Sequence, residues 1–344
     1  FNGNTSQYPS IPSTIIRNRP GVITQGAGIG ATVFRAADNF RNTTQGVYML
    51  WNEDEYCAGM QIRDITFEFG NNTVESGESN YTVGMGAYWT SDVVIENVEI
   101  LNTSGFWSIL LGGMAGHTDD CKNALLRNIH IYNSLGSSVA DDETYDHTAI
   151  RINMDNVVFS DSILENEAVP NNAAMLEFHG NNTIVHDVIV LNYTNFANLG
   201  VDCAEESYGQ VVSDCYMAVA NGINLWNVDG GRVINFTARN NEIVLLRHPS
   251  NTITAGFQTI NSYEFENVTI VGNTVTSDRP AGTGYYTTGC LFHVIENLII
   301  SDNRFVNCAN PILIYNTQHL ENCVISDNII NKFERDGLSQ YKTG

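Results

Sequence analysis

Four short stretches of the chain alternate polar or charged side chains with apolar ones. They are RINM (151–154), EFHG (177–180), VDCA (201–204) and LWNV (225–228). Such alternation predicts strands that bury one face and present the other. The presented face is expected to carry Arg151, Asn153, Glu177, His179, Asp202, Asn224 and Trp226. An inert strand face usually carries Thr, Ser and Asn, so this set indicates a site.

The two carboxylates of this set, Glu177 and Asp202, are suited to acid and base chemistry. On neighbouring strands about 4.8 Å apart, a diagonal pair separates its carboxyl groups by roughly 5–9 Å, which covers both geometries of glycoside hydrolysis. A neighbouring Arg151 favours the ionised form of Glu177. We therefore expect Glu177 to be the base and Asp202 the acid of a glycoside hydrolase.

The same residues allow other interpretations, which stay open at this point. In a lyase or epimerase acting on uronates, Arg151 would stabilise the uronate and His179 would take the C5 proton. Without catalysis, the set forms a surface ladder of ion pairs, Arg151–Glu177 and His179–Asp202. A groove that binds a glycan without cleaving it is the remaining alternative.

Aromatic side chains supply a surface on which the apolar face of a sugar ring stacks. Trp226 belongs to the polar set, and Trp89 and Trp107 take comparable positions at the ends of earlier strands. A row of such rings along one groove suits an extended glycan. Glu205 and Glu206, in the EESYG stretch (205–209) after the last carboxylate, are further candidates for the groove wall.

A second acidic cluster lies in two loop-like segments, GHTDD (116–120) and VADDETYDH (139–147). Calcium binds several carboxylate oxygens. The candidate ligands in these segments are Asp119, Asp120, Asp141, Asp142 and Asp146. A solvated acidic loop is the alternative interpretation. We expect that no cofactor is required and keep calcium as an open alternative.

A repeat is the feature that positions these residues. ENLIISDNRF (296–305) and ENCVISDNII (321–330) are near-copies of each other. Their pattern is apolar alternation, a small polar step, Asn or Asp, and alternation again. It recurs along the chain at Asp64, Asn97, Asn128, Asp161, Asp187, Asp214, Asn241, Asn273, Asn303 and Asn328.

Copies of short strands at intervals of roughly 25–33 residues predict a solenoid. Each copy holds at least two strands and no helical stretch. We therefore expect an all-β fold, a single-stranded right-handed parallel β-helix of about ten coils, with Asn or Asp in the left-handed backbone of each corner. Residues 1–344 then form one domain, with the entry and first coil at 1–45, coils at 46–333 and a tail at 334–344.

The repeat also predicts which side chains are neighbours. Alignment of the corners places Arg151 beside Glu177 and Asn153 beside His179. Matching the buried apolar residues of the following coil then places Asp202 beside His179, diagonal to Glu177. These columns are expected to line a long shallow groove on the outside of the solenoid.

The composition argues against several partners and sites. With 16 basic and 38 acidic residues the formal net charge is −22, which disfavours nucleic acid because its phosphates need cations. The sequence contains no run of about 18 apolar residues, the feature that would indicate a membrane-spanning helix. The seven cysteines include no CxxC pair, which argues against zinc. Bridges Cys203–Cys215 and Cys308–Cys323 are conceivable, but we expect buried free thiols at positions where the repeat needs apolar residues.

The coil pattern, with the apolar strand and Gly-rich turn of GVITQGAGIGATVFRA (21–36), resembles the pectin-lyase-like β-helix superfamily. That superfamily includes pectate lyases, polygalacturonases and phage tailspike depolymerases. The Asn-Thr-Asp and Gly-His-Gly signatures of polygalacturonases and the Asp-Pro-His of alginate epimerases are absent. The resemblance is therefore closest in character to the tailspikes. It implies a polysaccharide partner, a homotrimer and an extracellular or virion-associated location.

Overall fold

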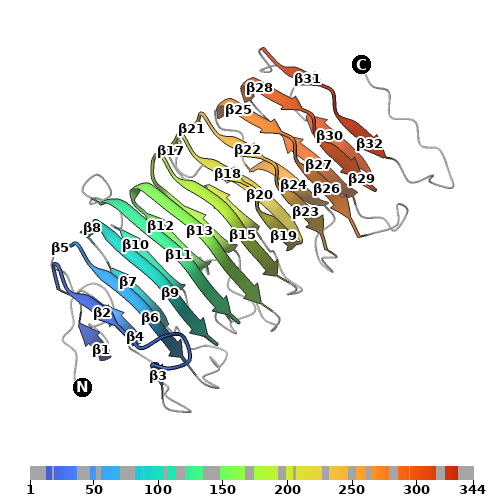
Figure 1. The fold of residues 1–344 in the computed structure, drawn as a ribbon. Helices are drawn as coiled ribbons and strands as arrows, with labels where there is room; N and C mark the ends of the chain where they lie inside the picture. The colour runs from blue at the N-terminus through green and yellow to red at the C-terminus, as the bar shows by residue number, and fades with distance from the viewer. Residues whose placement is uncertain are drawn as a thin grey trace, which may run out of the picture.

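The computed structural model describes residues 13–17, 19–36, 47–51, 56–69, 82–87, 89–103, 107–112, 121–134, 148–166, 174–192, 199–203, 207–226, 232–246, 253–260, 265–278, 286–293, 295–314 and 322–331. Every regular element in these ranges is a β-strand. The strands stack in successive coils along one axis, from the N-terminal coils in blue to the C-terminal coils in red (Figure 1). In this part of the chain no helix is long and apolar enough to cross a membrane.

One side of the solenoid is a sheet of eleven strands, called sheet I below. In spatial order its strands are β1 (Ser13–Arg17), β4 (Val47–Trp51), β7 (Thr82–Ala87), β10 (Trp107–Gly112), β12 (Thr148–Asn153), β14 (Ala174–Phe178), β16 (Leu199–Cys203), β20 (Asn221–Trp226), β24 (Ile253–Ile260), β27 (Tyr286–Phe292) and β30 (Asn310–Ile314).

The remaining sides are formed by a larger set of paired strands, called sheet II below. Its N-terminal strands are β2 (Ile23–Gln25), β3 (Val33–Arg35), β6 (Gln61–Glu68), β9 (Val93–Leu101), β11 (Lys122–Tyr132), β13 (Asp155–Asn166) and β15 (Ile184–Asn192). Its middle strands are β17 (Ser207–Tyr208), β18 (Val211–Ser213), β19 (Tyr216–Val219), β21 (Val233–Ile234), β22 (Thr237–Arg239) and β23 (Glu242–Leu245). Its C-terminal strands are β25 (Phe265–Val271), β26 (Thr274–Ser277), β28 (Ile295–Ser301), β29 (Arg304–Val306), β31 (Val324–Ser326) and β32 (Ile329–Asn331). A short separate pair joins β5 (Cys57–Ala58) to β8 (Thr90–Ser91).

Neighbouring strands in both sheets run parallel, because the chain returns to the same side of the solenoid once per coil. In sheet I, for example, β12 pairs with β14 and β14 with β16, each in parallel. This arrangement confirms the predicted all-β parallel β-helix. The predicted division of the chain into entry, coils and tail stays a prediction.

Apolar side chains from all sides meet inside the coils. In sheet I the predicted inward residues are buried: Ile152, Leu176, Phe178, Ile223 and Leu225. Between coils the fit is close enough to require glycine. A Cβ at Gly222 would lie only 2.3 Å from the backbone oxygen of Gly256 on the next strand. The core therefore consists of stacked layers, one per coil, that match the coils above and below.

The corners of sheet II agree with the sequence in the first coils and differ in the last. Left-handed φ angles confirm the predicted corners at Asp64, Asn97, Asn128, Asp161, Asp187 and Asp214. In the following coils the left-handed residues are Asn240, Gly272, Asp302 and Asp327. The predicted corners Asn241, Asn273, Asn303 and Asn328 are therefore wrong by one residue. Each coil there has two consecutive residues that suit a turn, and the pattern alone does not say which of them takes φ > 0.

The asparagines that follow these late corners form a ladder inside the solenoid. The backbone N–H of Asn241 donates to Oδ1 of Asn273 at 2.9 Å. The N–H of Asn273 donates to Oδ1 of Asn303 at 2.9 Å, and the N–H of Asn303 to Oδ1 of Asn328 at 3.0 Å. The Nδ2 group of Asn273 also donates to the carbonyl of Ala238 at 3.0 Å. The ladder thus pairs backbone groups that would otherwise be buried without partners.

All seven cysteines are free, as expected. Six are buried and Cys323 is half-buried. Burial raises the pKa of the Cys215 thiol to about 12, and it raises the pKa of Cys308 to about 12 as well. Thiols held in the neutral form are poor nucleophiles. These cysteines therefore act as small apolar core residues.

The ladder predicts that substitutions of two asparagines in neighbouring coils change the free energy of unfolding by very different amounts. Asn273→Ala removes a buried side chain that bonds two coils, so the free energy of unfolding should fall by about 1–3 kcal/mol for the groups left unpaired. Asn240→Gly, at an exposed left-handed corner, should change it by less than about 1 kcal/mol. Urea unfolding followed by circular dichroism measures both. Equal losses would contradict the proposed role of the ladder.

Candidate functional site

Four neighbouring strands of sheet I bring together the residues that the sequence singled out. The register aligns Arg151 of β12 with Glu177 of β14, and Glu177 with Asp202 of β16. Asp202 is in turn aligned with Asn224 of β20. We call this row of aligned residues the carboxylate column. The predicted neighbours Arg151 and Glu177 are confirmed.

The position of Asp202 differs from the prediction. It is aligned with Glu177 rather than with His179, because Cys203 is the residue aligned with Phe178. Cys203 is fully buried and behaves as a core residue. The run Leu199–Val201–Cys203 offers two registers with equally good apolar matching, and only the pairing of the strands distinguishes them. The two carboxylate-bearing residues are therefore direct neighbours, not a diagonal pair.

The second predicted pair of neighbours, Asn153 and His179, is confirmed by the backbone. The N–H of His179 donates to the carbonyl of Ile152 at 2.9 Å, which continues the parallel pairing of β12 and β14. In such pairing the donor lies opposite the residue after the acceptor. His179 therefore lies beside Asn153, one step along the strands from Glu177.

Glu177 is the centre of a compact polar cluster. Its Oε2 accepts a hydrogen bond from the hydroxyl of Thr148 at 2.7 Å, and its Oε1 lies 2.5 Å from Nε2 of His179. A guanidinium nitrogen of Arg151 lies 3.8 Å from the same Oε1. The Arg151 guanidinium is 6.0 Å from the centre of the Trp107 ring. Both oxygens of the carboxylate are thus engaged by protein groups.

The cluster is nearly closed to solvent, which corrects the prediction of an open shallow groove. The side chains of His179, Glu177 and Arg151 are 3%, 7% and 17% exposed. Leu110, which is aligned with Arg151, and Asn224, which is aligned with Asp202, are also buried. The part of sheet I around Glu177 is therefore closed to solvent. The alternative prediction of ion pairs on the surface is also wrong for Arg151–Glu177, because this pair is buried.

Electrostatics keep Glu177 ionised in spite of this burial. Burial alone raises the pKa of the carboxyl group, but the charge and hydrogen bond of His179, the charge of Arg151 and the hydrogen bond from Thr148 outweigh it and lower the pKa to about 2. A group that stays ionised at neutral pH serves as a base or nucleophile and not as an acid. The catalytic role that the sequence predicts for Glu177 stays a prediction.

The tryptophans do not form the predicted row. Trp107 lies against Arg151 at the start of the sheet I strands, and Trp226 is half-buried at the end of β20. Trp89 packs against the core and against Tyr56, with ring centroids 5.7 Å apart. It lies in the turn before β8, outside sheet I. Trp107 and Trp226 thus lie on strands of sheet I, at opposite ends of these strands.

Several predicted residues lie outside the described residues. They are Glu205, Glu206, Asp119, Asp120, Asp141, Asp142 and Asp146. Among the residues that the structure does describe, no group of three or more His, Cys, Asp or Glu side chains is arranged to hold a metal ion. Calcium binding by the acidic segments stays a prediction.

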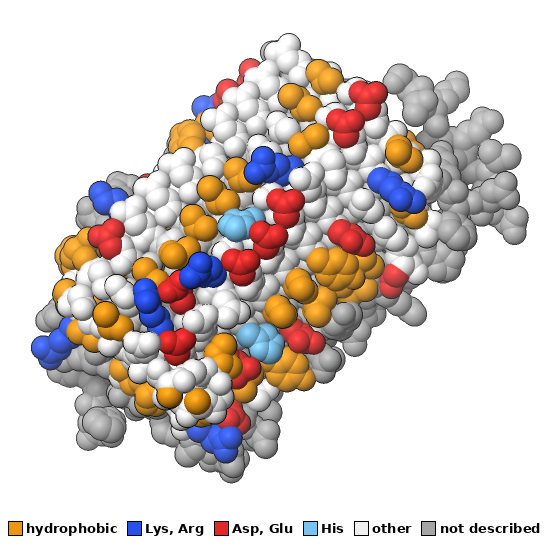
Figure 2. All heavy atoms as spheres, viewed as in Figure 1, with side chains coloured by type: hydrophobic (Ala, Val, Ile, Leu, Met, Phe, Trp, Pro, Cys, Tyr) orange, Lys and Arg blue, Asp and Glu red, His pale blue; other side chains and the backbone are white. Residues whose placement is uncertain are grey.

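The sequence reasoning missed the charged rows on the outside of sheet II. Figure 2 shows acidic, basic and histidine side chains gathered along the middle of one face. Glu96 lies 3.4 Å from Arg63 and 2.5 Å from Arg127, on the coils before and after it. The signal was present in the sequence as charged residues that recur at the coil interval. Such exposed ladders contribute little to stability individually.

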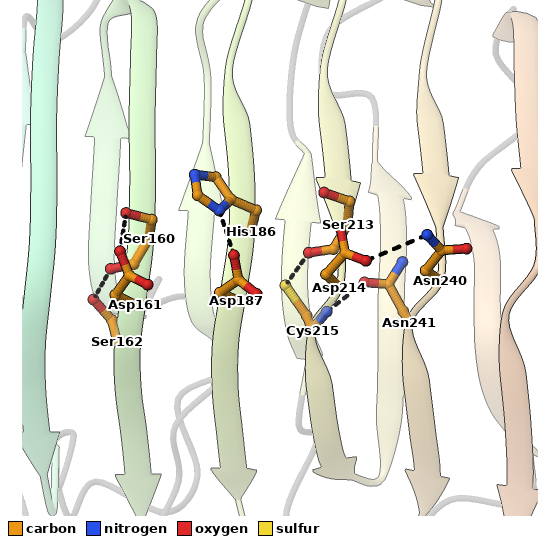
Figure 3. Close-up of polar contacts among 10 residues, drawn as sticks. All are labelled: Ser160, Asp161, Ser162, His186, Asp187, Ser213, Asp214, Cys215, Asn240 and Asn241. Carbon is orange, nitrogen blue, oxygen red and sulfur yellow. Dashed lines mark hydrogen bonds and ion pairs between the residues drawn. The ribbon is translucent and has the colours of Figure 1, made fainter.

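Three aspartates of these rows lie at equivalent corners of successive coils (Figure 3). Asp161 accepts a hydrogen bond from Ser160 at 3.0 Å, and Asp187 lies 2.7 Å from Nδ1 of His186. Asp214 accepts one from Asn240 at 3.3 Å. The left-handed backbone at all three explains why Asp is found there. Their arrangement therefore needs no ligand to account for it.

The cluster predicts a pH-dependent stability difference. Glu177→Gln leaves Arg151 and His179 without a buried counter-charge, so the free energy of unfolding at pH 7 should fall by about 3–5 kcal/mol. Because the pKa of Glu177 is lower in the folded than in the unfolded chain, its contribution is complete above the unfolded value of 4.5 and is lost as pH falls toward about 2.

Denaturation midpoints between pH 7 and pH 3 test this expectation. The difference in denaturation midpoint between the natural protein and Glu177→Gln should become smaller below pH 4.5, the ordinary pKa of the carboxyl. Glu296→Gln, which neutralises an exposed glutamate of β28, is the matched control and should show no comparable gap. A pH-independent gap would mean that packing, and not charge, explains the loss.

Comparisons with known proteins identify the fold through structure only. The sequence matches no known family and none of the curated proteins. Solved structures of the tailspike protein of Escherichia coli bacteriophage HK620 do match. A mutant in complex with hexasaccharide aligns with a TM-score of 0.71 at 15% identity, covering 92% of this chain and 55% of that one. The tailspike in complex with pentasaccharide aligns with a TM-score of 0.69 at 15% identity, covering 92% and 56%.

The chain thus spans about half the length of the tailspike chains that it matches. An identity this low carries the fold and leaves the chemistry to be argued from the residues. The parallel β-helix fold predicted from the coil pattern is confirmed at that level. This chain has the right-handed parallel β-helix fold of the HK620 phage tailspike.

Proposed function

We propose that the protein binds and degrades a polysaccharide, as a glycoside hydrolase that acts on a bacterial surface glycan. The observation that carries this proposal is the alignment of Glu177 and Asp202 on adjacent strands of sheet I. The HK620 tailspike has been solved with a pentasaccharide and a hexasaccharide bound, which supports a glycan as the ligand of this fold. A capsule, an O-antigen or a teichoic-type polymer is the expected substrate.

The alignment favours a particular geometry of hydrolysis. Adjacent strands place aligned residues about 4.8 Å apart, and retaining glycosidases hold their two carboxyl groups about 5–5.5 Å apart. In this mechanism Glu177, which is ionised, is the nucleophile. Asp202 is the general acid that protonates the leaving oxygen and later activates water. The shorter spacing replaces the diagonal pair inferred from the sequence.

The other residues of the cluster have supporting roles in this proposal. His179 and Thr148 fix the orientation of the Glu177 carboxylate through their hydrogen bonds. His179 and, to a smaller extent, Arg151 keep the carboxylate ionised by lowering its pKa. No cofactor takes part in the mechanism, although calcium in the acidic segments is compatible with it. We further propose a homotrimer that is virion-associated or extracellular, in keeping with the tailspike-like fold.

Glycan binding without cleavage is the second candidate function. The observation that favours it is the engagement and burial of Glu177: both oxygens have protein partners, and the side chain is 7% exposed. A lyase or epimerase acting on uronates is a third class. Such an enzyme would use His179 as its base, and here that imidazole is bound to Glu177.

Product analysis separates these functions. The protein is incubated with a panel of capsular, O-antigen and teichoic-type polysaccharides, and the products are assayed. We expect new reducing ends without ultraviolet absorbance. Glu177→Gln and Asp202→Asn should each lower the rate by about 100-fold or more, while the exposed Glu242→Gln should not change it.

The outcomes that would contradict the proposal are distinct. Unsaturated products that absorb in the ultraviolet indicate a lyase. Binding to a polysaccharide with no products indicates an adhesin. If folded Glu177→Gln and Asp202→Asn variants both retain full activity, the carboxylate column is not the catalytic site.

A further inference from the structure

Asn224, in the carboxylate column, is a buried amide without a partner. It is fully buried, and in the part of the chain that the structure describes neither its Oδ1 nor its Nδ2 has a hydrogen-bond partner. In the register it follows Asp202 and precedes Gln258 of β24. An unpaired buried amide is destabilising, since it has lost its bonds to water and gained none. This side chain therefore needs an explanation other than stability.

The asparagine ladder of sheet II provides the contrast. There, the side chain of Asn273 donates to three groups and accepts from Asn241. Asn273 is thus fully bonded, as expected of a residue with a structural role. Asn224 is equally buried and yet unbonded, so structural use does not account for it. Unpaired buried polar groups are common at functional sites because a ligand can complete them.

The ends of the carboxylate column give the site a direction. The polar residues of the column begin at Arg151 and continue to Gln258, which is half-exposed. The residue aligned with Arg151 on the N-terminal side is Leu110, and the residue aligned with Gln258 on the C-terminal side is Leu291. Both leucines are buried. Beyond the two carboxylates, the charged Arg151 lies on the N-terminal side, where it pairs with Glu177. The uncharged polar residues of the row, Asn224 and Gln258, lie on the C-terminal side.

We infer that Asn224 is a substrate-binding residue whose amide is kept unpaired for the sugar next to the carboxylate pair. Its Oδ1 accepts from one hydroxyl of the pyranose and its Nδ2 donates to another oxygen. The glycan then extends from Glu177 and Asp202 over β20 toward Gln258 of β24. Trp226, two residues beyond Asn224 on the same strand and half-exposed, offers its ring to the apolar face of the sugar. This inference rests on the proposed function.

Stability measurements test the unpaired amide without any ligand. Asn224→Leu replaces it with an apolar side chain of similar shape, so the melting temperature should stay unchanged or rise. Asn273→Leu is the matched control, because the same change removes a bonded amide, and its melting temperature should fall. If Asn224→Leu lowers the melting temperature as much as Asn273→Leu, then Asn224 has a structural role and the inference is wrong.

Binding measurements test the role in recognition. The probe is the polysaccharide that the natural protein depolymerises, and binding is measured in the Glu177→Gln background to prevent turnover. Asn224→Leu should weaken binding by about 10- to 100-fold, as expected for a lost pair of hydrogen bonds to a buried group. Gln258→Leu should weaken it less, because this side chain is half-exposed.

The failure of this inference is distinguishable from the failure of the proposed function. Unchanged affinity in Asn224→Leu, with activity still lost in Glu177→Gln, overturns the role of Asn224 and leaves the hydrolase standing. If the natural protein neither cleaves nor binds any polysaccharide of the panel, the proposed function and this inference both fall.

Discussion

Hydrogen bonding between equivalent positions of successive coils is the constraint on which this structure depends. The strands use backbone pairing. Beyond the corner of sheet II, where the chain leaves one strand for the next, Asn241, Asn273 and Asn303 take over with their side-chain amides. Each amide is satisfied only when the next coil carries its partner at the same position. A slip by one residue would therefore leave buried polar groups unpaired and reverse the inward and outward side chains of the strand.

The same register builds a site from residues that are far apart in the chain. Arg151, Glu177, Asp202 and Asn224 come from four coils and become neighbours only because β12, β14, β16 and β20 are paired in order. The two sheets differ in how far their charged side chains are exposed to solvent. Outside sheet II, charged ladders such as Arg63–Glu96–Arg127 remain solvated, and water screens them. In sheet I the Glu177 cluster is buried, so each charge acts strongly on the next. Glu177, the carboxyl whose pKa is lowered to about 2, is therefore found in sheet I.

Within sheet I, the polar residues differ in how completely they are bonded. Glu177 is held by Thr148, His179 and Arg151, which fixes its position and charge at the expense of access. The side-chain amide of Asn224, two strands away, has no hydrogen-bond partner among the described residues. The row therefore combines a carboxylate that is fixed in place with an amide, two strands away, that can gain hydrogen bonds from a ligand. A repeated scaffold tolerates an unpaired buried amide, because the coils on either side supply enough stability to offset its cost.

The sequence by itself determined the repeat, the all-β class, the inward apolar residues and the pairing of Arg151 with Glu177. Periodic spacing alone fixes these features. It did not determine the partner of Asp202, since Leu199, Val201 and Cys203 fit the core in two registers. Nor did it separate the left-handed corners from the buried asparagines after Asp214, because two turn-forming residues are adjacent in each late coil. The burial of Glu177 and the separate position of Trp89 depend on which segments pack over each face. Such packing joins residues of different coils, so only the tertiary structure decides it.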